Sequence, residues 1–280
     1  MLIAKRRAAF YHPLMPAPAS PPPVLTIAGS DCSGGAGIQA DLKAISAAGG
    51  YALTALTSVV SETPGLVSQI RLLDAEFIAD QLRVLLAGFP VRAAKTGMLG
   101  GAEQIRAVAG TWREIGRGVP LVVDPVMVAT SGGRLLKDDA VSTLCEELLP
   151  LATLITPNMD EAEVLWGRAV RTREDMTTCA AVLSLQFKTA VLVKGGHLTG
   201  DAAADVLCAN NEITWHESPR TPGVHTHGTG CTYSASIAAR LARGMGLVEA
   251  VADAKKYVSA AIAQHFAWTD ALHALNHFPA

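Results

Sequence analysis

Small polar residues alternate with glycine in the segment His227–Thr232, directly before an alanine-rich stretch with helical periodicity. The first turn of a helix leaves backbone N–H groups without partners, and the helix dipole adds a partial positive charge there. Such a turn binds anions, and we expect the anion to be a phosphate. Cys231 would lie inside this turn, where a positive field favours the thiolate. The segment therefore predicts phosphoryl transfer beside a polarised thiol.

The same segment also has a simpler interpretation. A Gly-Thr-Gly sequence before a helix is often only a loop and a cap, with Thr229 or Thr232 as the capping residue. Short glycine motifs carry a high false-positive risk when taken alone. Three other parts of the chain favour phosphate chemistry, and their agreement supports the functional interpretation.

A second glycine-rich loop follows the first predicted strand. It runs from Gly29 through Asp31 and Ala36 to Gly37, and its glycines let the backbone approach a ligand closely. The glycine spacing does not match the dinucleotide-binding fingerprint. An ordinary strand-to-helix turn remains the alternative.

Two acids lie where a nucleotide-bound magnesium ion would need them. Asp124 ends an apolar strand, and Glu161 lies three residues after Asn158 at a predicted helix start. Magnesium prefers hard oxygen ligands, often one or two carboxylates with waters between them. For Glu161 the alternative is a helix-start charge paired with the Asn158 cap.

A lysine ends another predicted strand. Lys194 precedes two glycines and His197, so its ammonium group is placed to reach a phosphate as a point charge. The alternative is a solvated lysine at a strand end. His197 and His227 are candidates to bind or relay protons, or are polar loop residues. Lys95 and Met98 are candidates to line a pocket, and for Met98 the alternative is ordinary core.

Strand and helix patterns alternate along the chain, which predicts an α/β fold with a mostly parallel sheet covered on both faces. Ligands of such sheets bind at the carboxyl ends of the strands. The glycine and polar clusters follow predicted strands, so we expect one active site at that edge. The expected strands are 24–28, 51–60, 66–70, 92–95, 121–124, 153–156 and 190–194, with a hairpin of 206–208 and 213–216; the expected helices include 38–48, 74–87, 172–187, 229–243 and 247–265, with further helices after 101, ending at 149 and starting at 159.

Composition limits the class of protein. The 280 residues are 50% hydrophobic and carry a formal net charge of -2, which suits a large core and argues against nucleic acid as the main partner. Apolar runs are too short for a membrane span. Five dispersed cysteines indicate reduced thiols in the cytoplasm and no zinc site. Residues 1–23 are proline-rich and predict a disordered tail, leaving 24–280 as a single domain.

Taken together, the motifs resemble the hydroxymethylpyrimidine/phosphomethylpyrimidine kinases of thiamine synthesis, within the ribokinase-like superfamily. They run in the family's order from about residue 24 to 266. The segments that carry the resemblance are Ala28–Asp31, Ser33–Asp41, Lys95–Leu99, Asp124–Val126, Thr156–Asn158, Lys194–His197 and Gly228–Thr232.

The resemblance implies a ribokinase-like three-layer α/β/α sandwich with little or no separate lid, which assembles as a homodimer. Together with the composition, it predicts no nucleic-acid and no membrane partner. It implies ATP and Mg²⁺ as cofactors. The expected reaction is phosphorylation of 4-amino-5-hydroxymethyl-2-methylpyrimidine and then of its monophosphate. A pyridoxal or pyridoxine kinase of the same lineage is the nearest alternative. A pyrimidine-binding regulatory domain without catalysis is another.

The resemblance also assigns residues. Asn158, Lys194 and Thr229 would bind the nucleotide. Asp124 and Glu161 would organise magnesium. Gly228–Cys231 would form the anion hole, with Cys231 as the base. The family's glutamine that grips the pyrimidine edge is missing, so Ser61 or Glu62 must take its place. The other positions expected to bind the substrate are Gly29, Asp31, Ala36, Met98 and Val126.

Overall fold

The computed structural model describes residues 20–127, 136, 138–196, 198, 200, 202–224, 227–269 and 272–280. Most of the proline-rich tail, the loop around Gly132 and His197 lie outside the described residues.

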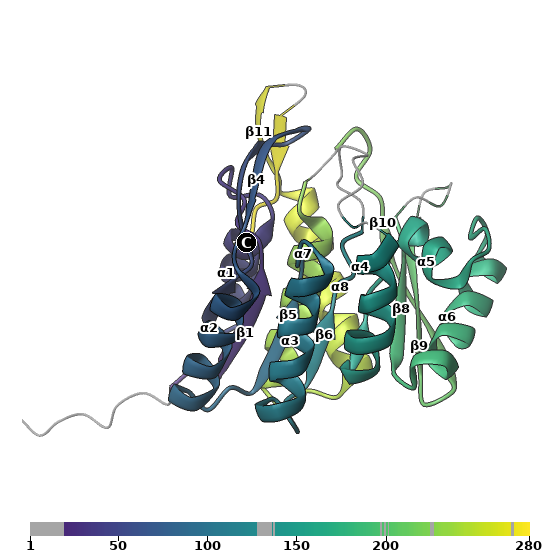
Figure 1. The fold of residues 1–280 in the computed structure, drawn as a ribbon. Helices are drawn as coiled ribbons and strands as arrows, with labels where there is room; N and C mark the ends of the chain where they lie inside the picture. Colours follow the sequence, from purple (N-terminus) through teal and green to yellow (C-terminus); the bar gives the residue numbers. More distant parts are fainter. Residues whose placement is uncertain are drawn as a thin grey trace, which may run out of the picture.

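An eight-stranded sheet forms the centre of the described chain, with the strand order β10-β9-β8-β7-β6-β5-β1-β2 (Figure 1). Pairing is parallel from β8 to β2, while β9 and β10 add an antiparallel edge. The parallel strands are apolar because both of their faces are covered. Their bounds are β1 (Pro23–Ala28), β2 (Tyr51–Leu56), β5 (Ala93–Thr96), β6 (Leu121–Val123), β7 (Leu154–Ile155), β8 (Ala190–Gly195), β9 (Ala202–Ala209) and β10 (Glu212–Pro219).

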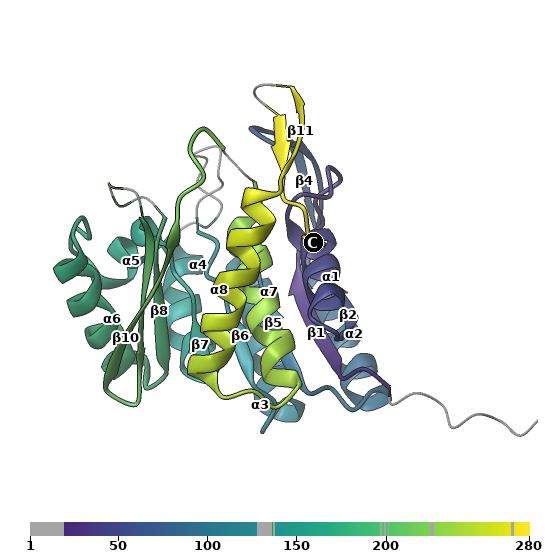
Figure 2. The ribbon, with the colours of Figure 1, turned by 180° about the vertical axis from the view of Figure 1, so that it is seen from behind.

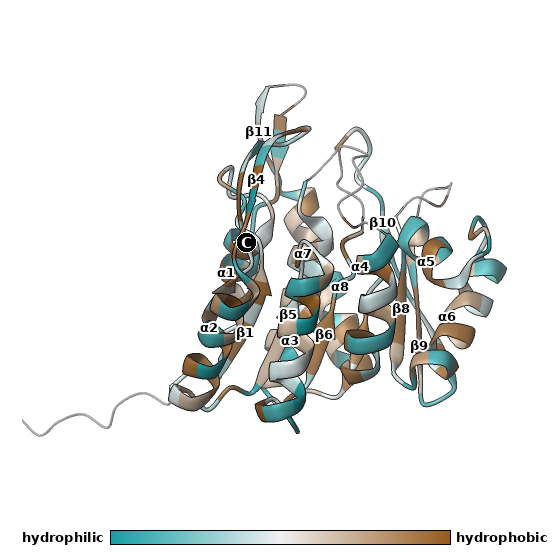
Figure 3. Ribbon diagram, in the orientation of Figure 1, coloured by the Kyte–Doolittle hydropathy of each residue, from teal (hydrophilic) through white to brown (hydrophobic). Residues whose placement is uncertain are grey.

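Helices cover both faces of this sheet, as the alternating pattern predicts. One hydrophobic cluster lies between the sheet and α1, α7 and α8 (Figure 2), and another lies between the sheet and α2 to α6 (Figure 1). Hydrophilic residues lie mainly on the outer sides of the helices (Figure 3). The bounds are α1 (Gly37–Ala47), α2 (Ala75–Gly88), α3 (Ala102–Ile115), α4 (Asp138–Thr143), α5 (Met159–Trp166), α6 (Arg173–Phe187), α7 (Thr229–Ala242) and α8 (Leu247–Ala263), with a π-helical turn (Leu144–Leu148) and a 3-10 turn (Leu149–Leu151) after α4.

The structure divides one predicted strand into two. The 51–60 run ends in the main sheet at Leu56, and β3 (Ser58–Thr63) pairs with β4 (Leu66–Leu72) in a separate two-stranded sheet. Thr57 lies between them, and its hydroxyl donates a hydrogen bond to the Met98 carbonyl at 2.7 Å. This contact holds the chain where it leaves the main sheet. The β3–β4 sheet therefore rises above the carboxyl ends of the strands (Figure 1).

A second hairpin was not predicted. The helix expected over 247–265 ends at Ala263, and β11 (Phe266–Thr269) then pairs with β12 (Leu272–Ala274). The hairpin expected from 206–208 and 213–216 is confirmed, and it turns at Asn210 and Asn211, which both have positive φ, a conformation that asparagine tolerates better than most residues. None of the helices in the described ranges is long and apolar enough to cross a bilayer.

Candidate active site

The first turn of α7 lies against the glycine-rich loop before α1. Gly228 is the N-cap with φ +83°, and a Cβ there would collide with the Gly35 carbonyl. This close approach requires glycine. In the alternative interpretation a threonine would be the cap, but the N-cap is Gly228, which has no side chain to cap α7, and the Thr232 hydroxyl lies 3.0 Å from His277 Nε2.

Lys194 and Asp124 meet beside this turn. Lys194 Nζ lies 2.8 Å from Asp124 Oδ1, and Asp124 Oδ2 accepts a hydrogen bond from the Ser234 hydroxyl at 3.3 Å. A Cβ added at Gly230 would lie 3.1 Å from Lys194 Nζ and 3.4 Å from Asp124 Oδ2. Burial would lower the pKa of Lys194, but the charges of Asp124 and Glu161 outweigh burial and raise it. Lys194 is therefore a fixed cation at the α7 turn, not a solvated one.

Glu161 has both carboxylate oxygens occupied by backbone donors. Glu161 Oε2 accepts from the Asn158 N–H at 2.9 Å, and Oε1 accepts from the Met127 N–H at 3.1 Å. Asn158 in turn accepts from the Glu161 N–H, which completes a capping box. The structure thus contains the helix-cap arrangement that was the alternative for Glu161. Burial, against the nearby charge of Lys194, raises the pKa of this carboxyl.

Cys231 lies where two helix N-termini meet, in the first turn of α7 and against the first residue of α1. The Gly37 N–H of α1 is near enough to the thiol to favour the thiolate. The expected lowering of the thiol pKa is wrong: burial raises the pKa of Cys231 to about 11, although Lys95 and the Gly37 N–H act in the opposite direction. Desolvation of the thiolate therefore exceeds the stabilisation by the helix ends.

The loop between β1 and α1 is shaped by Asp31. Its carboxylate accepts hydrogen bonds from the backbone N–H groups of Ser33, Gly35 and Ala36 at 2.7, 3.0 and 2.7 Å. Burial would raise the pKa of Asp31, but hydrogen bonds from His227, Ser33 and Ala36 hold it well below its usual value. This side chain organises the loop, which places Ala36 against the α7 turn.

The other expected substrate-binding positions also lie at this edge of the sheet. The Gly29 N–H donates to the Met98 carbonyl at 3.1 Å, and a Cβ at Gly29 would meet the Met98 methyl group. Val126 follows Asp124 and has φ +43°, which is rare for a β-branched residue. Strained backbone of this kind is concentrated at functional sites.

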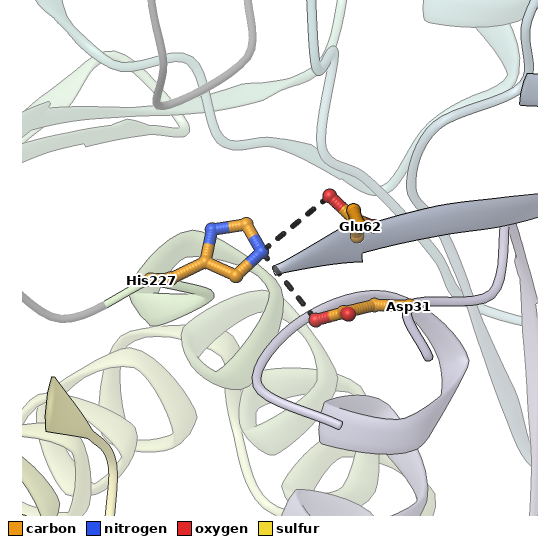
Figure 4. Close-up of side chains that lie close together, drawn as sticks. All are labelled: Asp31, Glu62 and His227. Atoms are coloured by element: carbon orange, nitrogen blue, oxygen red, sulfur yellow. Dashed lines mark ion pairs between the residues drawn. The ribbon is translucent and has the colours of Figure 1, made fainter. Parts of the chain in front are cut away.

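Of the two candidates for the missing glutamine, the structure brings Glu62 to the loop. His227 Nε2 lies 3.9 Å from Glu62 Oε2 and 3.4 Å from Asp31 Oδ2 (Figure 4). Ser61 is exposed, and the β3–β4 register shifts between Ser61 and Glu62. Such a bulge re-aims the side chain that follows it. Burial and then the charge of Asp31 raise the pKa of Glu62.

Lys95 does not line a pocket. Its side chain is completely buried, and Nζ lies 2.9 Å from both carboxylate oxygens of Asp41. The Thr26 hydroxyl donates a further hydrogen bond to Asp41 at 2.5 Å. Burial would lower the pKa of Lys95, but Asp41 outweighs burial and raises it. This pair joins α1 to β5 beneath Cys231.

A cavity of about 340 Å³ lies beside the Asp31–Glu62–His227 group. It separates the β1–α1 loop and the β3–β4 turn from the hairpin of β11 and β12. Sequence patterns did not predict its C-terminal wall, although the Phe-Ala-Trp-Thr run of β11 is typical of a strand. The lining residues are Ser33, Gly35, Thr63, Pro64, His227, Trp268, Leu272, His273 and Ala274.

Comparison with known proteins agrees with this arrangement. A family model described as "Phosphomethylpyrimidine kinase" matches residues 31–276. The hydroxymethylpyrimidine/phosphomethylpyrimidine kinase of Rhizobium meliloti is 45% identical over 239 residues, which are 85% of this chain and 89% of that protein.

Two solved structures have the same ribokinase-like fold. A Bacillus subtilis pyridoxal kinase in an ADP complex is 37% identical with a TM-score of 0.85, covering 92% of this chain and 98% of that chain. A phosphomethylpyrimidine kinase from Clostridium difficile 630 is 38% identical with a TM-score of 0.76, covering 86% of this chain and 99% of that chain. The resemblance seen in the motifs is confirmed: the chain belongs to the phosphomethylpyrimidine kinase family.

Proposed function

We propose that this chain transfers phosphate from ATP to the hydroxymethyl group of 4-amino-5-hydroxymethyl-2-methylpyrimidine, and then phosphorylates the monophosphate. The observation that carries the proposal is the meeting of two half-sites at Cys231. The α7 turn, Lys194 and Asp124 form one half, and the loop from Gly29 to Gly37 forms the other. Phosphoryl transfer needs mainly positioning and charge stabilisation, which these groups supply.

The phosphate half of the site would hold the nucleotide. Lys194 would contact the phosphates as a point charge, and the N–H groups of Gly228–Cys231, with Thr229, would stabilise charge on the transferred group. Asn158 lies beside Lys194, since the two residues form an isolated parallel bridge. Charge that develops during transfer would therefore meet donors that are already in place.

Two acids fit a magnesium ion in different ways. Asp124 is buried, and its Oδ2 faces the α7 turn, so it fits as a direct carboxylate ligand. Glu161 already accepts two backbone hydrogen bonds, so it fits contact through water. When bound, the ion would neutralise phosphate charge. Lys194 also pairs with Asp124, at 2.8 Å.

A vitamin-B6-type kinase is the second candidate function, because the Bacillus subtilis structure named above is a pyridoxal kinase. The experiment that separates the candidates is incubation of the purified chain with Mg-ATP and each alcohol, followed by mass measurement of the products. We expect two phosphoryl groups on the pyrimidine. Transfer of one group to pyridoxal alone would favour the alternative, and tight binding without product would favour a regulatory domain.

Glu62 is expected to recognise the amino-substituted edge of the acceptor ring. The variant Glu62→Ala should raise the acceptor KM about 10-fold or more, since hydrogen bonds to a charged group contribute about 1.5–3 kcal/mol. The KM for the pyrimidine should rise more than the KM for pyridoxal. Ser61→Ala is the matched control, because Ser61 precedes Glu62 on the same strand and is exposed. Equal effects of both variants would contradict this role.

The same role predicts a pH dependence. The pKa of Glu62 is raised above its usual value of 4.5 by burial and by Asp31, so protonation occurs at a higher pH than in the unfolded chain. If the carboxylate binds the acceptor, the acceptor KM should increase as the pH falls through this raised pKa. The variant Glu62→Gln should lose that increase, which steady-state kinetics across the acidic range would show.

We also propose that the chain acts in the cytoplasm as a homodimer. The five cysteines are free. Leu66 and Leu72 on β4 are 63% and 46% exposed, and Tyr51 at the edge strand β2 is 52% exposed. Exposed apolar side chains of this kind would be removed from water in an interface between subunits. Light scattering of the purified chain would test the subunit count.

A further inference from the structure

Asp205 is a buried acid on β9, directly opposite Lys194 in the antiparallel β8–β9 ladder. Its side chain is 4% exposed and accepts hydrogen bonds from two separate parts of the molecule. Oδ1 accepts from the Gly195 N–H at 3.0 Å, and Oδ2 accepts from Lys255 Nζ at 2.7 Å. Asp205 therefore joins α8 to the residue that directly follows Lys194.

The Asp205 carboxylate also lies near α7. Burial and the nearby charge of Asp205 raise the pKa of the Tyr233 hydroxyl, two residues after Cys231, and this hydroxyl donates to the Val251 carbonyl at 3.5 Å. Gly195 itself is pressed against β9, because a Cβ there would collide with the Ala204 carbonyl. The Lys194-Gly195 peptide is thus held by two contacts: Gly195 packs against the Ala204 carbonyl, and its N–H donates to the Asp205 carboxylate.

A buried charge is costly unless it is paired and hydrogen-bonded. Asp205 meets that requirement through hydrogen bonds with β8 and α8, and its charge lies near Tyr233 on α7. A stabilising ion pair alone would need only Lys255. The further hydrogen bond from the Gly195 N–H fixes the last residues of β8. It therefore fixes the backbone from which the Lys194 side chain extends.

We propose that Asp205 is a positioning residue for phosphoryl transfer, which fixes the Lys194-Gly195 peptide relative to the first turn of α7. Asp205 acts through Lys194 and does not itself contact the nucleotide. The inference rests on the phosphate-binding role proposed above for Lys194.

The chain offers a matched control. Arg240 on α7 pairs with Asp253 on α8 at 2.5 Å, so this ion pair also joins α7 to α8. The hydrogen-bond partners of Arg240 lie on the two helices, at Asp253 and Ser236. Loss of the Asp253 carboxylate should weaken the helix pair without moving Lys194.

The experiment compares Asp205→Ala, Asp205→Asn and Asp253→Ala in steady-state kinetics, below the unfolding temperature of each variant. Asparagine keeps an acceptor for the Gly195 N–H, whereas alanine removes it. We expect Asp205→Ala to lower kcat/KM for ATP about 10- to 100-fold, the range found when groups that orient a functional residue are removed. The KM for the acceptor should stay close to the wild-type value. Asp205→Asn should retain most of kcat/KM for ATP, and Asp253→Ala should retain all of it.

A second pair of variants covers the case in which Asp205→Ala does not fold. Asp205→Asn/Lys255→Met and Asp205→Leu/Lys255→Met both remove the two charges, and only the first keeps an acceptor for Gly195. Replacement of a buried ion pair by uncharged residues is often close to neutral for stability. The leucine variant should show the ATP-specific loss, and the asparagine variant should not.

The positioning role is overturned if the alanine or leucine variant keeps wild-type kcat/KM for ATP, or if the variants with and without an acceptor lose it equally. Lys194→Ala is measured alongside them. A wild-type KM for ATP in Lys194→Ala would remove the phosphate role of Lys194. A loss in Lys194→Ala with none in Asp205→Ala would remove only the positioning role.

Discussion

Replacement of Cys231 by alanine is expected to abolish most turnover while nucleotide affinity stays close to normal. The thiol lies between the N-termini of α1 and α7, where the proposed acceptor and phosphate halves of the site meet. General base catalysis typically contributes about 10²- to 10⁴-fold. We therefore expect kcat to fall within that range. ADP affinity should change little, because the phosphate contacts proposed for Lys194 and the backbone of α7 remain.

The pH profile gives an independent test of the thiol as base. Burial raises the pKa of Cys231 to about 11, so the thiolate fraction at neutral pH is small and grows as the pH rises. The wild-type kcat should therefore increase with pH on the alkaline side of neutrality. Cys231→Ser should lack this increase, because a serine hydroxyl does not ionise there. Near-normal turnover in Cys231→Ala would exclude the thiol as base, and transfer would then rest on positioning alone.

The convergence of the candidate site residues was predictable because it follows from the parallel sheet. Asp124 and Lys194 end predicted strands and Asn158 follows one, and the carboxyl ends of parallel strands share one edge. The structure brings Asp124 and Lys194 to 2.8 Å of one another. Local spacing also predicted the Asn158 cap of α5, because a capping box needs only residues three positions apart.

The electrostatic state of the site was not predictable in the same way. The helix position of Cys231 suggests a lowered pKa, yet burial by distant segments dominates. The orientation of Glu62 depends on a bulge in β3, and the residue types of this strand do not predict that bulge. Asp205 did leave a signal: it is a single acid within the otherwise apolar run of β9. Such an acid in a buried strand requires a partner from elsewhere in the fold.

The second large effect is expected for stability, in the variant Lys95→Met. Lys95 and Asp41 are both fully buried and paired at 2.9 Å, so loss of the lysine leaves an unpaired carboxylate in the core. Breaking a buried pair from one side typically costs about 3–5 kcal/mol. Chemical denaturation should show this loss in the free energy of unfolding. Asp41→Asn/Lys95→Met should recover much of it, because that variant buries no unpaired charge.

The pH dependence of Lys95→Met follows from Asp41. Burial already raises the pKa of Asp41 above its usual 3.8, and Lys95 opposes that shift. Without Lys95 the folded-state pKa should rise further, so the folded variant binds a proton more tightly than the unfolded chain does. The stability deficit should therefore shrink as the pH falls toward 3.8 and grow as the pH rises through the folded-state value. A deficit that does not change with pH would mean that Asp41 finds another cation.

The same variant should also change the pH profile of turnover. Because Lys95 lowers the pKa of Cys231, Lys95→Met should shift the alkaline limb of kcat to still higher pH. That shift would connect this buried pair to the proposed chemistry at Cys231.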